Sequence, residues 1–243
     1  MKPSAKIVLV FVTGLSIALI VLASGILSNS EIIEQLEDKT VYTPNANVAI
    51  NANIFDGNIE IQSTSGSQIE LIYTLKAPHN ELSTIKIQTN ETKDNNQTLL
   101  LTKAQSGLYG SSERSADLLI KLPTTSQYNL TLLSGAGNIS VPKLNIQKIV
   151  VSTAKGNIVI TDNQTCTHIE AISMTGDVTV NLAKNTLFYV AASVSQGSID
   201  YSEISLDTEI TTATRLKGAT LAGKGQLALI LSCANGKIAL HYL

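Results

Sequence analysis

Small or apolar residues alternate with polar ones on both sides of six glycines, and the same order of residue types returns around each. Two positions after every such glycine stands Ile or Val, and seven positions before it stands Ile, Leu or Val. A period of two is typical of β-strands, because successive side chains point to opposite faces. We predict that two strands meet at a corner at each glycine, which accepts positive φ at little cost. The corner glycines are Gly57, Gly137, Gly156, Gly176, Gly197 and Gly236.

The spacing of these glycines predicts how the strands stack. Between Gly137 and Gly197 they recur with a period of about 20 residues, and the interval from Gly197 to Gly236 is about twice as long. A fixed period of about 20 residues is typical of a solenoid in which each coil stacks on the last. We therefore predict a mostly β protein, a single-stranded parallel β-helix. An antiparallel sandwich is the alternative. Gly218 divides the last interval but lies in a poor match, so an irregular coil or a loop is expected there.

Two parts of the chain depart from the regular coils. Residues 62–130 contain longer alternating runs, which predict long strands joined by exposed turns, with the direction of their pairing left open. The final coil is apolar on both strand faces, with Leu229 inward and Ile230 outward, and no polar cap follows Leu243. A solenoid end needs a cover. We expect residues 62–130 or another subunit to supply it, the second option giving self-association through the C-terminal coil.

The amino-terminal region predicts a membrane anchor. Residues 7–27 carry no charge, and 21 helical residues at about 1.5 Å each span about 31 Å, enough for a bilayer core. Lys2 and Lys6 precede this run and acidic residues follow it, which places the amino end in the cytoplasm. The expected organisation is a cytoplasmic end (1–6), a transmembrane helix (7–27), an acidic linker (28–44) and an extracytoplasmic solenoid (45–243). Secretion after cleavage of a signal peptide is the alternative.

Composition argues against one class of partner. Charged residues make up 15% of the chain, the net charge is −2, and Arg114 and Arg215 are the only arginines. A nucleic-acid-binding surface needs concentrated positive charge, so no nucleic-acid partner is expected. There is no Trp, and aromatic residues make up 4% of the chain, so platforms for stacking bases or sugars are scarce.

The repeat resembles a known family. The matching stretches are "FDGNIEI" at 55–61, "LLIKLPTTSQYNLTL" at 118–132, and then "GAGNISV", "AKGNIVI", "MTGDVTV" and "SQGSIDY". They resemble the bacterial and archaeal extracytoplasmic β-strand-repeat family of adhesin-like proteins of unknown function, over about residues 45–243. The resemblance implies a surface-exposed β-solenoid. It supplies no catalytic residues to carry over.

Candidate chemistry is sparse. His79, His168 and His241 have no companions at metal-ligand spacing, so neither a metal nor another cofactor is expected. No motif for a catalytic nucleophile is present. Asp177 and Asp200 would lie one coil apart with Glu203 nearby, which raises the alternative of a polysaccharide-acting enzyme, since such enzymes use paired carboxylates. No catalytic residue is predicted. Instead, local side-chain hydrogen bonds are expected to brace the corners at four positions, Asn58, Asn138, Asn157 and Asp177.

Cysteines and glycosylation sequons add two further expectations. Cys166 and Cys233 are separated by about 3.4 coils or roughly 16 Å along the axis, too far for a disulfide. Acceptor sequons for N-linked glycans occur at five positions, usable only in a host that glycosylates: Asn90, Asn96, Asn129, Asn138 and Asn163.

These patterns together predict a membrane-anchored surface protein, an adhesin-like binding or structural module without catalytic activity. Its expected partners are the membrane, through residues 7–27, and a protein or glycan of the envelope or surface. Besides the polysaccharide-acting enzyme, a pilin- or stator-like filament subunit remains an alternative, because those proteins also join an apolar amino-terminal helix to a β domain.

Overall fold

The computed structural model describes residues 33–94, 97–106, 114–161, 165–220 and 227–243. In this part of the chain the regular elements are β-strands and one short 3-10 helix, η1 (Leu82–Thr84). The strands are β1 (Ile33–Tyr42), β2 (Asn47–Ile54), β3 (Ile59–Thr64), β4 (Ile69–Pro78), β5 (Ile85–Asp94), β6 (Gln97–Ser106), β7 (Ser115–Pro123), β8 (Gln127–Ala136), β9 (Ile139–Val141), β10 (Ile146–Lys155), β11 (Ile158–Thr161), β12 (His168–Thr175), β13 (Val178–Leu182), β14 (Phe188–Asp200), β15 (Leu206–Thr212), β16 (Arg215–Thr220) and β17 (Leu227–Tyr242).

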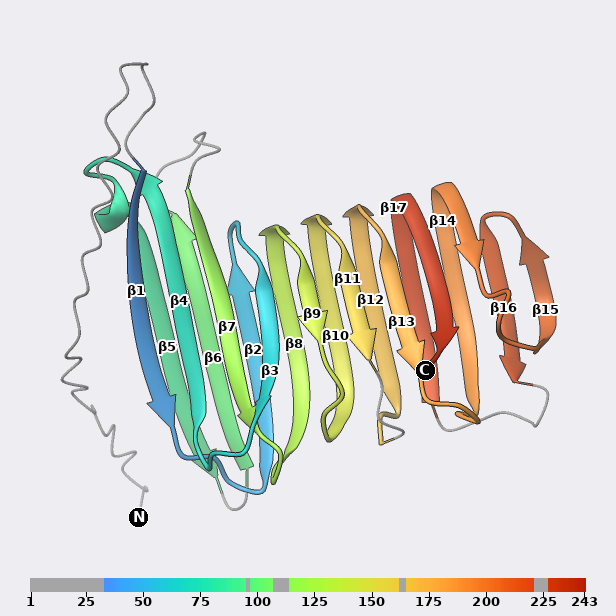
Figure 1. Ribbon diagram of the computed structural model, residues 1–243, viewed down its shortest axis with the longest axis horizontal. Helices are drawn as coiled ribbons and strands as arrows, with labels where there is room; N and C mark the ends of the chain where they lie inside the picture. The colour runs from blue at the N-terminus through green and yellow to red at the C-terminus, as the bar shows by residue number, and fades with distance from the viewer. Residues whose placement is uncertain (1–32, 95–96, 107–113, 162–164, 221–226) are drawn as a thin grey trace, which may run out of the picture.

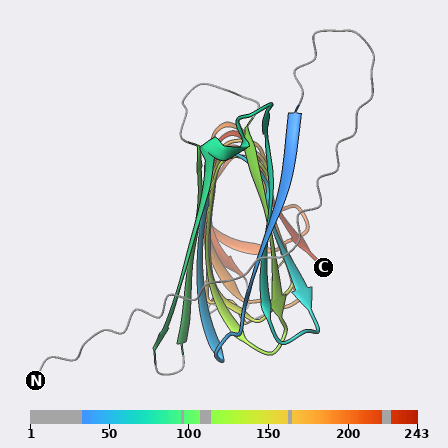
Figure 2. The ribbon, with the colours of Figure 1, turned by 90° about the vertical axis from the view of Figure 1, so that its left-hand side faces the viewer.

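The strands form two faces that pack against each other, and the coils stack along the long axis of the molecule (Figure 1; Figure 2). We call the first the broad face. Its strands lie in the order β5, β6, β2, β8, β10, β12, β17, β14, β16, β15. The opposite face has the order β1, β4, β7, β3, β9, β11, β13, β17, β14. The long strands β14 and β17 contribute to both faces, because each continues through its corner glycine.

Parallel pairing joins neighbouring coils in the middle of the molecule, so the predicted solenoid is confirmed there. Both ends differ from a purely parallel β-helix. β1–β4, β4–β7 and β5–β6 are antiparallel at one end, and β14–β16 and β15–β16 at the other. Gly218 accordingly lies within the antiparallel strand β16 and not at a corner.

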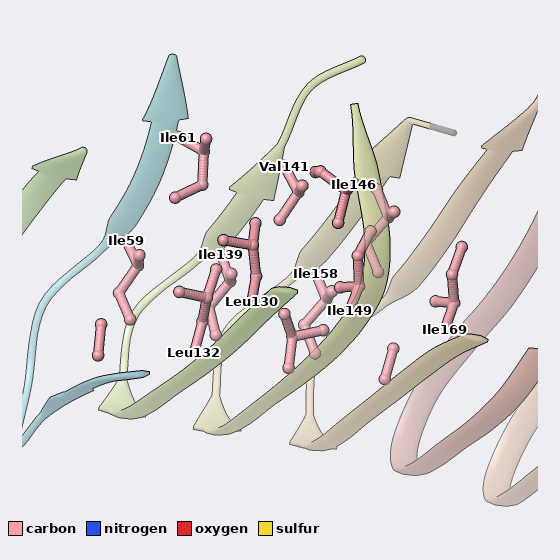
Figure 3. Packing of buried hydrophobic residues seen from close by; sticks show 14 of the residues in the cluster. Ile59, Ile61, Leu130, Leu132, Ile139, Val141, Ile146, Ile149, Ile158 and Ile169 are labelled. Carbon is pink, nitrogen blue, oxygen red and sulfur yellow. The ribbon is translucent and has the colours of Figure 1, made fainter. Parts of the chain in front are cut away.

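The inward columns read from the sequence fill the space between the two faces. Figure 3 shows Leu130 and Ile149 of the broad face pointing toward Ile139 and Ile158 of the opposite face, with Ile169 in the next coil. All of these are almost completely buried. Burial of apolar surface stabilises a fold by about 25 cal/mol per Å², so these buried columns make the main contribution to the stability of the protein. Ile199 of the β14 coil is only partly buried, because that coil lies near the end of the stack.

Spatial order and chain order differ at two places, which corrects the prediction that each coil stacks on the last. The coil of β2 and β3 pairs directly with β8 and β9, although four strands separate the two coils in the chain. β6 and β7 pair with the outer side of that coil. At the other end, β17 lies between β12–β13 and β14. The spatial order of the corner glycines is therefore 57, 137, 156, 176, 236, 197.

The insertion of β17 also changes how the final coil is covered. We expected residues 62–130 or another subunit to cover it, and that prediction is wrong, because β14 of the same chain pairs with its outer side. β16 then pairs with the first half of β14, and Ala213 O accepts a hydrogen bond from Ile199 N (3.3 Å). β4, β5, β6 and β7, which come from residues 62–130, instead lie with β1 at the opposite end of the stack. The reason given for self-association through the C-terminal coil therefore disappears.

The amino-terminal expectations fall partly outside the described residues. The predicted anchor, 7–27, and the cytoplasmic end, 1–6, are not among them. Within the part of the chain that the structure describes, no helix is long and apolar enough to cross a membrane. Residues 33–42, assigned to an acidic linker from their charge, form β1, which pairs along its whole length with β4.

Candidate functional site

The six corner glycines form one column that runs through the stack. Their φ angles lie between +133° and +152°, in the region that disfavours residues with a side chain. The corners also touch: a Cβ atom on Gly156 would lie 2.2 Å from the carbonyl oxygen of Gly137. The column therefore needs glycine for two separate reasons, the backbone angle and the approach of the neighbouring coil.

The polar residues next to the glycines form a ladder between coils. The Oδ1 atom of Asn58 accepts a hydrogen bond from the Asn138 backbone N–H, and Asn138 Oδ1 accepts one from the Asn157 N–H, both at 2.8 Å. The ladder continues through Asp177 to Lys237 N. The bracing expected from the sequence is therefore present, but each side chain binds the neighbouring coil and not its own corner. These amides are structural.

A second set of side chains, missed in the sequence, donates to the corner carbonyls. Ser134, Thr153, Ser173 and Cys233 all stand three positions before a glycine, and each contacts the carbonyl of the neighbouring corner at 2.8–3.0 Å. Burial, with a smaller contribution from Asp177, raises the pKa of the Cys233 thiol, which keeps its proton for this contact. The sequence feature that could have identified these donors is the recurrence of a small hydrogen-bonding residue in an otherwise apolar inward column.

The two cysteines are free and buried. The predicted absence of a disulfide is confirmed, but the reason given for it was wrong. Cys233 lies in the coil next to Cys166, opposite Ser173. The two cysteines are separated along the strand direction by about 7 residues, or about 23 Å at strand rise, and not by several coils along the axis.

The carboxylates considered for catalysis do not converge. β17 lies between Asp177 and Asp200, so they are two coils apart. Lys237 Nζ donates to Asp200 Oδ2 (2.8 Å) and, with Ser202, holds the pKa of that carboxyl well below its usual range. Asp177 is occupied in the ladder. Neither carboxyl group is placed to donate a proton to a shared substrate.

The histidines each pair with a glutamate. His79 Nδ1 lies 2.6 Å from Glu34, and the other two histidines lie 3.4–3.7 Å from Glu203 and Glu170. Among the described residues, no group of three or more His, Cys, Asp or Glu side chains is close enough to hold a metal ion.

Exposed aliphatic side chains gather on the broad face. Its six exposed members, which we call the apolar stripe, are Leu101, Leu133, Ile172, Met174, Ile210 and Ile230. They come from β6, β8, β12, β15 and β17. Around Ile230 and Ile210 the surface is hollowed by a shallow pocket of about 290 Å³ that also contacts Lys217. Exposed apolar side chains that gather on one face often mark a binding surface.

A second hollow on the same face is lined by amides. It has a volume of about 390 Å³ and spans β5, β6, β2 and β8. We call it the amide groove. Its polar lining includes Asn51, Asn53, Gln88, Asn90 and Lys103, and Leu101 and Leu133 contribute apolar surface. Sequence reasoning missed it, because β2 meets β8 only through the out-of-order stacking.

The sequons lie in different surroundings. Asn90 and Asn129 are exposed in the strands β5 and β8, and Asn138 belongs to the ladder. Asn96 and Asn163 lie outside the described residues.

Comparison with solved structures finds the same fold. The crystal structure of a candidate cell adhesion protein from Clostridium sporogenes superposes with a TM-score of 0.69 at 16% identity, over 86% of this chain and 100% of that one. A candidate adhesin from Bacteroides fragilis matches at 14% identity over 84% of this chain and 96% of its own, with a TM-score of 0.33, too low to establish a shared arrangement. No curated protein matches the sequence.

The comparison with protein families is more specific. The model of the Toastrack DUF4097 family matches residues 45–215. β17 follows the matched span, although it pairs with β12, β13 and β14 inside the stack. The match includes five of the six corner glycines, all except Gly236, and covers more than half of the 243 residues. The chain therefore belongs to the Toastrack DUF4097 family.

Proposed function

We propose that the protein is a membrane-tethered binding module of the cell surface that attaches to a partner through its broad face and has no catalytic role. The observation that carries this proposal is the gathering of six of the exposed large apolar side chains on that face. The fold shared with a candidate cell adhesion protein supports it.

The two faces differ in how many large aliphatic side chains their strands expose: six on the broad face and three, Ile33, Val41 and Val159, on the opposite face. On the opposite face, Glu70 lies between Lys39 (2.9 Å) and Lys121 (3.5 Å), so three neighbouring strands are joined by ion pairs. On the broad face, Ile172 is 36% exposed and Ile230 is 44% exposed, on the neighbouring strands β12 and β17. Removing such side chains from water is favourable, so a partner that covers the six on the broad face gains more free energy than one that covers the three on the opposite face.

The tether is the remaining part of the proposal. Residues 7–27 are long and apolar enough to span a bilayer, and Lys2 and Lys6 favour a cytoplasmic amino end. The solenoid would then lie outside the cell, with the broad face available to the envelope or to a neighbouring cell. Secretion after cleavage is the alternative that the topology experiment in the Discussion separates.

The binding proposal is tested by charge substitutions on each face. Ile172→Asp and Ile230→Asp place a carboxylate in the apolar stripe, and Val159→Asp is the matched control, since Val159 is 39% exposed on the opposite face. A host strain lacking the gene is complemented with the full-length chain or a variant. Retention of its cells on a surface coated with native envelope fragments is then measured, at equal surface expression.

We expect the two stripe variants to lower retention about tenfold or more, because changing a hot-spot residue at the centre of an interface costs about 2 kcal/mol or more. Val159→Asp should retain wild-type attachment. Equal retention with and without the chain, or equal losses on both faces, would contradict the proposal.

A further inference from the structure

Amide side chains occur in this protein in two contrasting surroundings. In the corner ladder, Asn58, Asn138 and Asn157 are held by hydrogen bonds to neighbouring coils. In the amide groove, Asn51 and Asn53 on β2 and Gln88 and Asn90 on β5 are exposed. Within the described part of the chain, their side chains make no hydrogen bond. The groove amides therefore have no structural partner that would account for them.

The positions of these amides are unfavourable for the strands that carry them. Asn is depleted in β-strands, where β-branched and aromatic residues pack better. β2 nevertheless has Asn51 and Asn53 at consecutive outward positions in the middle of the sheet, between β6 and β8. Solubility alone would be served by charged side chains, as on the opposite face. The presence of neutral amides in place of charged side chains therefore indicates that these residues recognise a ligand.

The register brings the amides around two exposed leucines. Leu101 is the neighbour of Asn51 on one side and of Asn90 on the other. In the next row, Asn53 lies between Lys103 and Leu133. Four adjacent strands, about 4.8 Å apart, give the groove a width of about 14 Å between the outer two. The amides thus border the two leucines across a groove whose width matches the length of a short linear oligomer.

This pattern fits the chemistry of a sugar. A carboxamide donates two hydrogen bonds and accepts two, so it can bind hydroxyl groups that act in both ways. The C–H faces of a pyranose ring can cover an exposed leucine. Of the described residues that line the groove, Lys103 is the one that carries a charge, and it adds a donor for a hydroxyl or for the carboxylate of an acidic sugar. A strongly anionic ligand would find no further cation among these residues.

We propose that the amide groove binds a short oligosaccharide, which makes the partner of the broad face a glycan. This inference rests on the proposed function, because the groove lies on the same face as the apolar stripe. Asn51 and Asn53 form the centre of the site, and Gln88 and Asn90 its outer edge. Leu101 and Leu133 contact the sugar rings.

The test uses the full-length chain, made in a host without N-glycosylation so that Asn90 stays unmodified, and purified in detergent. Linear trisaccharides serve as probes: neutral hexose, N-acetylhexosamine and uronic acid trimers, titrated by calorimetry. At least one should bind. Asn51→Ala/Asn53→Ala should weaken that binding by about tenfold or more, since it removes several hydrogen bonds. Asn53→Asp, which keeps the shape but replaces the amide donor, should also weaken a neutral trimer.

Asn129→Ala is the matched control, because Asn129 is an exposed amide on β8 of the same face that does not line the groove. It should bind as the wild type does. Binding by no trimer, or binding that the groove variants leave unchanged, would overturn the inference. If Ile172 is required for attachment but no sugar binds, the glycan inference fails alone. If a sugar binds the groove but attachment is independent of the broad face, the proposed function fails alone.

Discussion

At the scale of single residues, the fold depends on positions where the backbones of neighbouring coils touch, so that few residue types fit there. The corner glycines combine positive φ with contact between backbones. The small donors three positions earlier reach the same carbonyls. The glycine recurs in each of the six coils and the small donor in four of them, which explains why the period is clear in the sequence around these positions.

Gly156→Ala tests the corner. The substitution adds a Cβ atom 2.2 Å from Gly137 O on a backbone at φ +144°, so we expect a loss of about 1–3 kcal/mol in the free energy of unfolding, or more if the coils must separate. Urea unfolding of the full chain measures it. Gly66→Ala is the control, since its nearest neighbour would be Thr64 Oγ1 at 3.4 Å. Equal stability of the two variants would show that the corner tolerates a side chain.

At the scale of elements, β14 and β17 have the same pattern and fit the same edge. Val190 and Leu229 are equivalent inward residues, as are Gly197 and Gly236, and the two strands pair with these residues side by side. Either strand could extend the coil of β12 and β13 by its pattern of inward residues. The structure places β17 there, and β14 outside it.

Engineered cysteine pairs distinguish the two arrangements. In the structure, Glu170 is the neighbour of Ile230, and Ala191 lies one strand further away. Glu170→Cys with Ile230→Cys should therefore form a disulfide, because Cα atoms on adjacent strands lie within bonding range. Glu170→Cys with Ala191→Cys should not, at a distance of about 10 Å between alternate strands. Peptide mapping without reduction shows which of the two pairs is cross-linked. A disulfide in the second pair and none in the first would show that the coils stack in chain order.

At the scale of the whole molecule, the protein is a stack of parallel coils with antiparallel strands at both ends (Figure 1). The edge strands carry charged side chains, such as Lys86 and Lys93 on β5 and Asp207 and Glu209 on β15. Charges on edge strands disfavour pairing with other chains. Pairing through the ends of the stack is therefore disfavoured, which leaves the two faces as the surfaces open to a partner.

Protease accessibility tests the proposed orientation of this molecule in the membrane. If Lys2 and Lys6 keep the amino end inside, protease added to intact cells should remove a tag fused after Leu243. The tagged protein should also sediment with membranes. Release of the protein into the medium would favour cleavage of residues 7–27 and secretion. A tag that is protected until the cells are lysed would show that the C-terminal domain lies in the cytoplasm, opposite to the proposed topology.

Much of the fold could be predicted because each coil repeats the same local rules. Alternation at Ile139 and Val141, for example, placed two inward residues after Gly137, and both are buried. The candidate site could not be predicted in the same way. Asn51 and Leu133 are far apart in the chain, and they line one groove only because β2 pairs with β8.

The sequence by itself therefore determined the strands, the corners and the buried columns, since these follow from side-chain alternation and backbone angles within a single coil. Only the tertiary structure decided which coils are neighbours. Coils with the same inward columns present similar edges, so local pattern does not choose among them. The choice depends on connections and on the antiparallel strands at each end, and those are properties of the whole chain.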